Sequence, residues 1–195
     1  MTLAIELEKT FGKLTDEQFF AFCQANKGRL RIERDENGQI LLRSLSGALT
    51  SMRNAGLSAE FVLWNRQNQS GKVLAHAGFT LPDTSVRGAD VSWLSDEKWN
   101  HIPEAERKRF ARVVPDFVLE LRSASDQLPD LQHKMDKWIA NGVRLAWLID
   151  VGNAVTYIYR PGQPTSEKPF TETLSGEEVL PGFSIHLKQF FESLA

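Results

Sequence analysis

Hydrophobic residues along the chain switch between helical and extended spacing, which predicts an α/β protein. A helix is predicted over residues 15–25, because Thr15 with Gln18 three positions on forms a capping box ahead of a broad apolar face. Apolar and polar residues then alternate on both sides of residues 35–38. The Asn37-Gly38 pair tolerates the positive φ of a tight turn, so a β-hairpin is predicted here. A second helix over about 48–67 and strands over 73–80 and 90–94 follow.

The middle of the chain carries a strand, a helix and a second strand in succession. Residues 116–122 form a β-branched and apolar run typical of a central strand, residues 131–140 have helical spacing, and residues 145–149 are apolar throughout. This order and spacing predict two parallel strands joined by a right-handed crossover. Further strands and turns are predicted after residue 154, with a short helix over about 187–194. The predicted fold is therefore α/β, a mixed central sheet flanked by helices.

Composition is that of an ordinary globular protein. With 195 residues, of which 42% are hydrophobic, the chain can form one sizeable core, and no repeat or Pro/Gly-rich linker divides it, so we expect a single domain over residues 1–195. No segment is long enough to span a membrane, and the amino terminus lacks the basic start and apolar run of a secretory signal. The single cysteine, Cys23, excludes an intramolecular disulfide and a cysteine-rich zinc site. These features indicate a cytoplasmic protein without a membrane partner.

The formal net charge of −2 excludes the global basic excess that marks many nucleic-acid binders, so any DNA contact must be local. A local basic cluster could neutralise a few phosphates and give a salt-dependent affinity. The alternative is a solvated helix face interleaved with Glu104 and Glu106, which charge patterning alone favours. The cluster consists of Arg107, Lys108, Arg109 and Arg112.

Carboxylates carry the candidate chemistry. The chain has no glycine-rich phosphate loop, dinucleotide fingerprint or serine elbow, and its four histidines have no metal-ligand spacing. The period of two places Asp116, Glu120 and Arg122 on one face of the predicted strand over 116–122. An acid beside a guanidinium could hold a hard cation and a phosphate together there. The alternative is an ion pair at a strand edge.

Asp90 begins its own strand and supplies a second carboxylate beside Glu120. Two carboxylates that converge from neighbouring strands make a site for Mg²⁺ or Mn²⁺. The cation would polarise a phosphate and lower the pKa of a bound water, while a neighbouring cationic side chain stabilises the developing negative charge. The residues thus indicate hydrolysis of a phosphodiester bond. Asp116 is a candidate supplementary ligand, with the capping of a turn as the alternative.

The order of motifs over most of the chain resembles the Uma-two family of restriction endonucleases, within the PD-(D/E)XK nuclease superfamily. Each matching segment is weak alone, and together they are specific. They are residues 30–33 ahead of Gly38, residues 53–54 at the head of a helix that ends at Trp64, and residues 88–93, 114–123, 130–135, 142–150 and 180–183. The resemblance implies a restriction-endonuclease-like fold.

Position by position, the resemblance assigns Asp90 to the metal-binding aspartate and Glu120 to the acid of the (D/E)XK element. Arg122 then stands where the superfamily has lysine, and an arginine keeps its proton and cannot act as a general base, although it could orient water and stabilise the transition state. Lys134 flanks the core-facing stripe of its predicted helix and could supply the missing amine. The alternative for Lys134 is a stem along the core boundary with a solvated head.

Two hypotheses follow. The first is a Mg²⁺- or Mn²⁺-dependent endonuclease whose partner is DNA and whose catalytic residues are Asp90, Glu120 and Arg122 or Lys134. A homodimer with a two-fold axis would suit double-strand cleavage. The second is a catalytically inactive nuclease-like scaffold that binds nucleic acid or a protein partner, with the basic cluster doing the binding. A phosphoester hydrolase that uses the same two carboxylates on another substrate is a third alternative.

Overall fold

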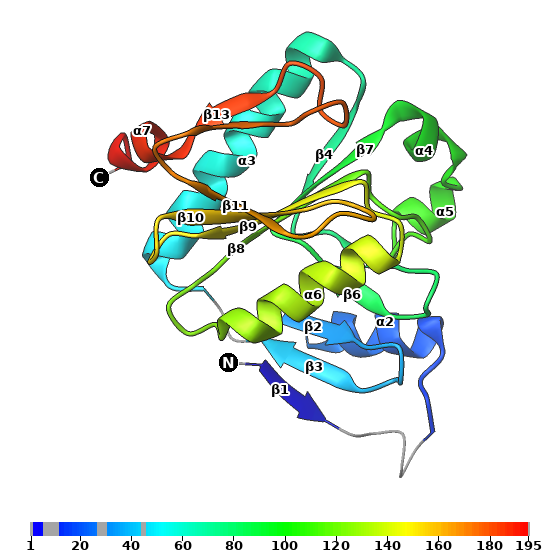
Figure 1. Ribbon diagram of the computed structural model, residues 1–195. Helices are drawn as coiled ribbons and strands as arrows, with labels where there is room; N and C mark the ends of the chain where they lie inside the picture. The colour runs from blue at the N-terminus through cyan, green and yellow to red at the C-terminus, as the bar shows by residue number, and fades with distance from the viewer. Residues whose placement is uncertain (1, 6–11, 27–30, 44–45, 195) are drawn as a thin grey trace.

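The larger sheet is mixed, as the sequence predicts. The computed structural model describes residues 2–5, 12–26, 31–43 and 46–194 (Figure 1). In this part of the chain a six-stranded sheet has the order β11-β10-β9-β8-β7-β4, in which β8 and β9 are parallel and the other neighbours antiparallel. Its strands are β4 (Gly71–Ala75), β7 (Val91–Ser95), β8 (Phe117–Leu121), β9 (Leu145–Asp150), β10 (Val155–Tyr159) and β11 (Ser166–Pro169).

Helices cover both faces of this sheet (Figure 1). Helix α3 (Ala48–Asn68) packs on one face together with β12 (Thr173–Ser175), β13 (Ser184–His186) and α7 (Leu187–Glu192), and α6 (Leu128–Ala140) packs on the other. The alternation along β8 separates the two cores, because Phe117, Leu119 and Leu121 join the α3 side while Val118 joins the α6 side. Glu120 has the parity of Val118, so it lies on the α6 face.

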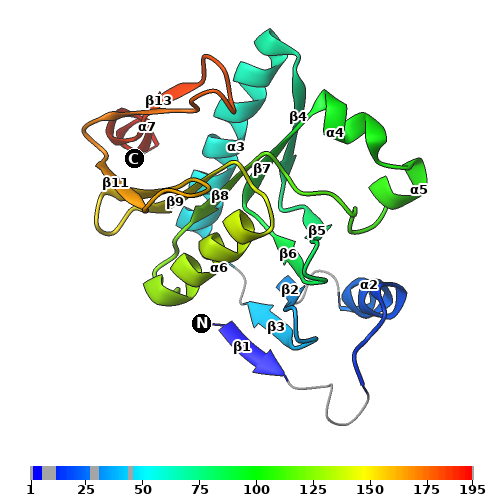
Figure 2. The same cartoon turned by 45° about the vertical axis from the view of Figure 1, so that its right-hand side comes forward.

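A second, five-stranded antiparallel sheet lies beside the first, with α2 (Asp16–Ala25) next to it (Figure 2). Its order is β1-β3-β2-β6-β5, with β1 (Thr2–Ile5), β2 (Arg31–Arg34), β3 (Ile40–Arg43), β5 (Gly78–Thr80) and β6 (Val86–Gly88). The predicted hairpin is confirmed as β2 and β3, and the capping box of Thr15 is present. Leu30, the first residue of one matching segment, lies outside the described residues.

The predicted strand over 73–80 is wrong in one respect. It is two strands, β4 and β5, which belong to different sheets. The chain turns between them at His76, whose φ of 53° lies in the left-handed region that non-glycine residues rarely adopt. Strand β6 was not predicted, since its three residues follow a turn-rich segment. A two-residue link, Ala89-Asp90, carries the chain from β6 in one sheet into β7 in the other.

The remaining helices are short. Ser95 caps α4 (Asp96–His101), and α5 (Glu104–Arg107) follows Pro103. Within the described part of the chain, the helices are too short or too polar to traverse a lipid bilayer.

Candidate functional site

The two sheets enclose a cavity of about 340 Å³. Its walls come from α2, β2, the turn at His76, β6, the Ala89-Asp90 link, β8 and α6. Three carboxylates reach it from three different segments, namely Glu33 on β2, Asp90 in the link and Glu120 on β8. The structure therefore brings together Asp90, Glu120 and Lys134 of the residues that the sequence singles out.

Asp90 is held by hydrogen bonds to both of its carboxylate oxygens. Oδ2 accepts from the backbone N–H of Leu121 at 2.9 Å, while Oδ1 lies 3.1 Å from Arg31 Nη1 and 3.5 Å from His76 Nδ1. Burial alone would raise the pKa of Asp90. The hydrogen bonds from His76 and Leu121 and the charges of Arg31 and Lys134 instead hold this pKa below its ordinary value of 3.8. Asp90 is therefore an anion at neutral pH.

The Lys134 ammonium joins the two sheets through the cavity. It lies 2.7 Å from Glu33 Oε1 and 2.7 Å from Glu120 Oε1, and it donates to the carbonyl of Gly88 at 2.5 Å. With 3% of the side chain exposed, the alternative of a solvated head is wrong. Leu131 and Met135 of α6 pack into the core on the face of the sheet that carries Glu120. Lys134 lies between them in the sequence, so its amine reaches the Glu120 carboxylate.

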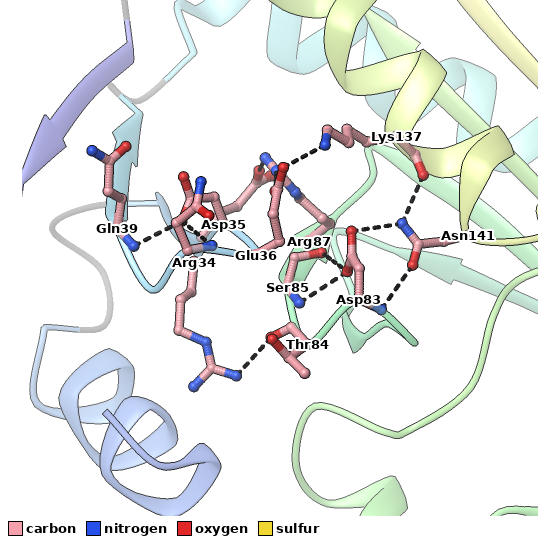
Figure 3. A network of polar contacts seen from close by, with 12 residues as sticks. Arg34, Asp35, Glu36, Gln39, Asp83, Thr84, Ser85, Arg87, Lys137 and Asn141 are labelled. Carbon is pink, nitrogen blue, oxygen red and sulfur yellow. Dashed lines mark hydrogen bonds and ion pairs between the residues drawn. The ribbon is translucent and has the colours of Figure 1, made fainter. Parts of the chain in front are cut away.

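A polar network continues behind the cavity and fixes β2 against α6 (Figure 3). Glu36, in the β2–β3 turn, accepts from Lys137 and from Arg87, the latter at 3.2 Å. The hydrogen bond from Lys137 lowers the pKa of Glu36 despite burial. Arg87 also lies 3.8 Å from Glu33. Glu33 thus pairs with Lys134, and Glu36, three residues later in the chain, pairs with Lys137, while Arg87 contacts both acids.

The structure places Arg122 and Asp116 away from the cavity. Arg122 follows the last residue of β8, where it pairs with Asp150 at 2.6 Å and donates to the backbone carbonyl of Asp126. Asp116 precedes β8, where it accepts from the backbone N–H of Ser95 and pairs with Lys98 at 2.9 Å. The shared strand face therefore brings only Glu120 to the cavity, because the other two residues lie beyond the ends of the strand.

Acidic side chains surround the basic cluster. Arg112 pairs with Asp16 at 2.7 Å, Lys108 pairs with Glu104 at 2.9 Å, and Arg109 lies 4.0 Å from Glu17. The guanidinium of Arg107 stacks on the ring of Trp99. These neighbours reduce the positive potential of the surface. The arrangement supports the interpretation as a solvated face.

Sequence reasoning missed Glu33, Arg31, His76 and Arg87 as residues of this site. Glu33 appears in a matching segment, but the short strand β2 is mostly charged, and its two consecutive buried residues Glu33 and Arg34 do not follow the alternation of a half-buried strand. The signal that could have singled it out is a lone carboxylate between two arginines in sequence. Arg87 reaches Glu33 because β6 pairs with β2 in the same sheet, while Arg31 and His76 reach Asp90 through tertiary contacts of distant segments.

The donor set fits a magnesium-like cation. Among the described residues, no group of three or more His, Cys, Asp or Glu side chains lies close enough together to hold a metal ion by itself. Mg²⁺ commonly binds through one or two carboxylates and completes its shell with water and substrate phosphate. Asp90 and Glu120, two oxygen donors that line one cavity, match this mode.

Comparison with known proteins identifies the family of the chain and its fold. The model of the Uma2 family, described as "Putative restriction endonuclease", matches residues 16–188. The chain resembles the crystal structure of "a putative nuclease belonging to DUF820 from Anabaena variabilis ATCC 29413", with a TM-score of 0.75 and 17% identity over 93% of this chain and 99% of that one. A DrdV–DNA complex matches 68% of this chain and 10% of that one, with a TM-score of 0.38 and 14% identity. No curated protein matches significantly.

The structural resemblance shows a shared fold, and the family match spans nearly the whole sequence, including the β2, β6, β8 and α6 segments that line the cavity. The chain belongs to the Uma2 family of restriction-endonuclease-like proteins.

Proposed function

We propose that this protein is a metal-dependent endonuclease that hydrolyses DNA phosphodiester bonds in the cavity between its two sheets. Asp90 and Glu120 hold a Mg²⁺ or Mn²⁺ ion, and Lys134 acts beside them. The observation that carries the proposal is the Lys134 ammonium, buried 2.7 Å from Glu120 in the cavity that Asp90 lines. The family supports nuclease chemistry, and the cavity supplies the acids and the amine that such chemistry requires.

Each side chain has a separate task. A bound divalent cation supplies Lewis-acid polarisation of the scissile phosphate and a water of lowered pKa. The low pKa of Asp90 keeps this ligand ionised. Lys134 holds a positive charge at a fixed place, where it orients the attacking water and stabilises charge that develops on the phosphate oxygens.

Glu33 positions this amine. The three N–H donors of Lys134 are directed to Glu33, Glu120 and the carbonyl of Gly88. If Glu120 held a metal ion, the Lys134 donor directed to it would be available to the substrate, while Glu33 and Gly88 would keep the ammonium in place. We therefore assign to Lys134 the role of the lysine in the (D/E)XK element. Arg122 lies just after the end of β8, where its guanidinium pairs with Asp150, and we assign it a structural role.

The test combines calorimetric titration of Mn²⁺ with plasmid nicking in Mg²⁺ or Mn²⁺. Asp90→Asn and Glu120→Gln should each abolish metal binding and lower the nicking rate by about 10³-fold, equivalent to ~4 kcal/mol of transition-state stabilisation. Glu172→Gln is the matched control, because this acid is 58% exposed and lies outside the cavity. Nicking that persists in either variant, with unchanged urea unfolding, would remove that residue from the site.

Lys134 and Arg122 are separated by a second pair of variants. Lys134→Met should abolish nicking, and Arg122→Met should retain it. The reverse result would return the lysine role to Arg122. A wild-type protein that binds neither Mn²⁺ nor Mg²⁺ would instead favour the non-catalytic scaffold.

A further inference from the structure

Arg31 and His76 cover one oxygen of Asp90. Oδ2 of this carboxylate is fixed by the backbone N–H of Leu121, whereas Oδ1 meets the guanidinium of Arg31 at 3.1 Å and the imidazole of His76 at 3.5 Å. The side chain of Asp90 is 7% exposed, but those of Arg31 and His76 are 39% and 45% exposed. Oδ2 is thus held by the backbone of β8, and Oδ1 is held by two side chains that are partly exposed to solvent.

The backbone places His76 at this position at a conformational cost. Its φ of 53° is left-handed, and its N–H donates to the carbonyl of Asp90 at 3.2 Å. Such conformations persist where the surroundings hold them, and they concentrate at functional sites. Here the turn between β4 and β5 brings the imidazole directly over the carboxylate.

Arg31 contacts Asp90 through one nitrogen of its guanidinium. Within the described residues, Asp90 is the ion-pair partner of Arg31. This differs from Arg87, which lies deeper and contacts both Glu33 and Glu36. The Asp90 carboxylate of this pair is 7% exposed, so the guanidinium can leave it at small cost only when another cation takes its place.

We propose that Arg31 and His76 are substrate-phosphate ligands, which occupy Asp90 Oδ1 in the free protein and transfer their hydrogen bonds to a DNA phosphate when Asp90 binds the metal. This inference rests on the proposed function. A cation on Oδ1 repels the guanidinium and takes the lone pairs that it uses. A phosphate beside the cation would then offer two oxygens to the planar guanidinium of Arg31, which suits a bidentate pair of hydrogen bonds.

The proposal predicts changes of opposite sign in one variant. Arg31→Met removes a cation that competes for Asp90, so Mn²⁺ alone should bind about threefold to fivefold more tightly in calorimetry. The same variant should bind a fluorescein-labelled 20-base-pair duplex about tenfold more weakly in Ca²⁺, because a charge-assisted hydrogen bond to phosphate is lost. His76→Asn, which tolerates left-handed φ, should change both affinities in the same directions. A purely structural role would not strengthen one ligand and weaken the other.

Arg144→Met is the matched control. Arg144 has 48% of its side chain exposed and lies outside the cavity, so its loss changes the net charge equally and should leave both affinities within about twofold. If Arg31→Met leaves Mn²⁺ affinity unchanged or lowers it while Glu120→Gln abolishes metal binding, the inference fails and the proposed function stands. If wild-type protein binds no Mn²⁺, or Glu120→Gln binds it normally, both fail together.

Discussion

Replacement of Lys134 by methionine tests whether one ammonium holds the two sheets together through the site. Lys134→Met keeps an unbranched side chain, shorter by one atom, and removes the charge. It leaves the carboxylates of Glu33 and Glu120, 8% and 5% exposed, facing one another without the cation that lies 2.7 Å from each. Removal of one partner of a buried ion pair typically costs 3–5 kcal/mol, because the remaining charge is buried and uncompensated.

The structure indicates a cost at the lower end of this range of about 3–5 kcal/mol. Arg87 stays 3.8 Å from the second oxygen of Glu33 and the backbone N–H of Gly88 stays 3.3 Å from the first, so part of the compensation survives. We therefore expect Lys134→Met to lower the free energy of unfolding by about 3 kcal/mol. A double variant, Lys134→Met with Glu33→Gln, should recover at least about 1 kcal/mol of this, since one uncompensated charge is gone.

Urea unfolding at pH 7.5, followed by the fluorescence of the five tryptophans, measures these differences. Lys137→Met is the matched control on the same helix, one turn further along. Its partner Glu36 is 27% exposed and its own side chain 28%, so the expected loss is below about 1 kcal/mol. If Lys134→Met costs no more than Lys137→Met, or if Glu33→Gln worsens it, the ammonium does not hold the buried acids as described.

Three further predictions concern other parts of the molecule. Asp150→Asn should lower stability by about 1–2 kcal/mol at pH 7, because it breaks the pair with the quarter-exposed Arg122. The pKa of Asp150 is lowered below 3.8 although burial opposes this, so the ion pair contributes its full stability above pH 3.8. Urea unfolding should show that the difference in unfolding free energy between variant and wild type narrows only below that pH. Gly71→Ala should cost about 2 kcal/mol or more by the same assay, since a Cβ would lie 2.2 Å from the carbonyl oxygen of Leu94, and a smaller loss would show that the strands yield. Burial raises the pKa of Cys23 to about 11, so iodoacetamide at pH 8 should react roughly 100-fold more slowly with native than with unfolded protein, and equal rates would contradict this environment.

Elements with local signals were predictable from the sequence. Thr15 and Gln18 form the capping box that begins α2, Asn37-Gly38 turns the hairpin, and the parallel pair β8 and β9 follows from the apolar runs around α6. The period of two also separated the two faces of β8, and the structure shows that the face of Glu120 meets α6. Each of these signals lies within one element, one turn or one strand-helix-strand unit, where residue spacing determines the outcome.

The site itself required information that spacing does not carry. The contact of Lys134 with Glu33 joins residues 101 positions apart, and the sequence gives no direct measure of such pairing. Strand parity suggested that Arg122 accompanies Glu120, but parity loses its meaning where β8 ends, one residue earlier. The turn at His76 could not be predicted either, because a non-glycine residue with a left-handed backbone conformation does not change the hydrophobic periodicity of the sequence.

The bridge between Glu33, Glu120 and Lys134 also sets the order in which the site can form during synthesis. The ribosome makes β2 first, and about a hundred residues must follow before α6 brings the amine that neutralises its acid. The unit β8-α6-β9 can form from contacts close in sequence, whereas docking of β2 must wait for it and closes a long loop. The cavity would thus be assembled late in translation, so that a partly made chain carries the carboxylates of Glu33, Asp90 and Glu120 without the amine of Lys134.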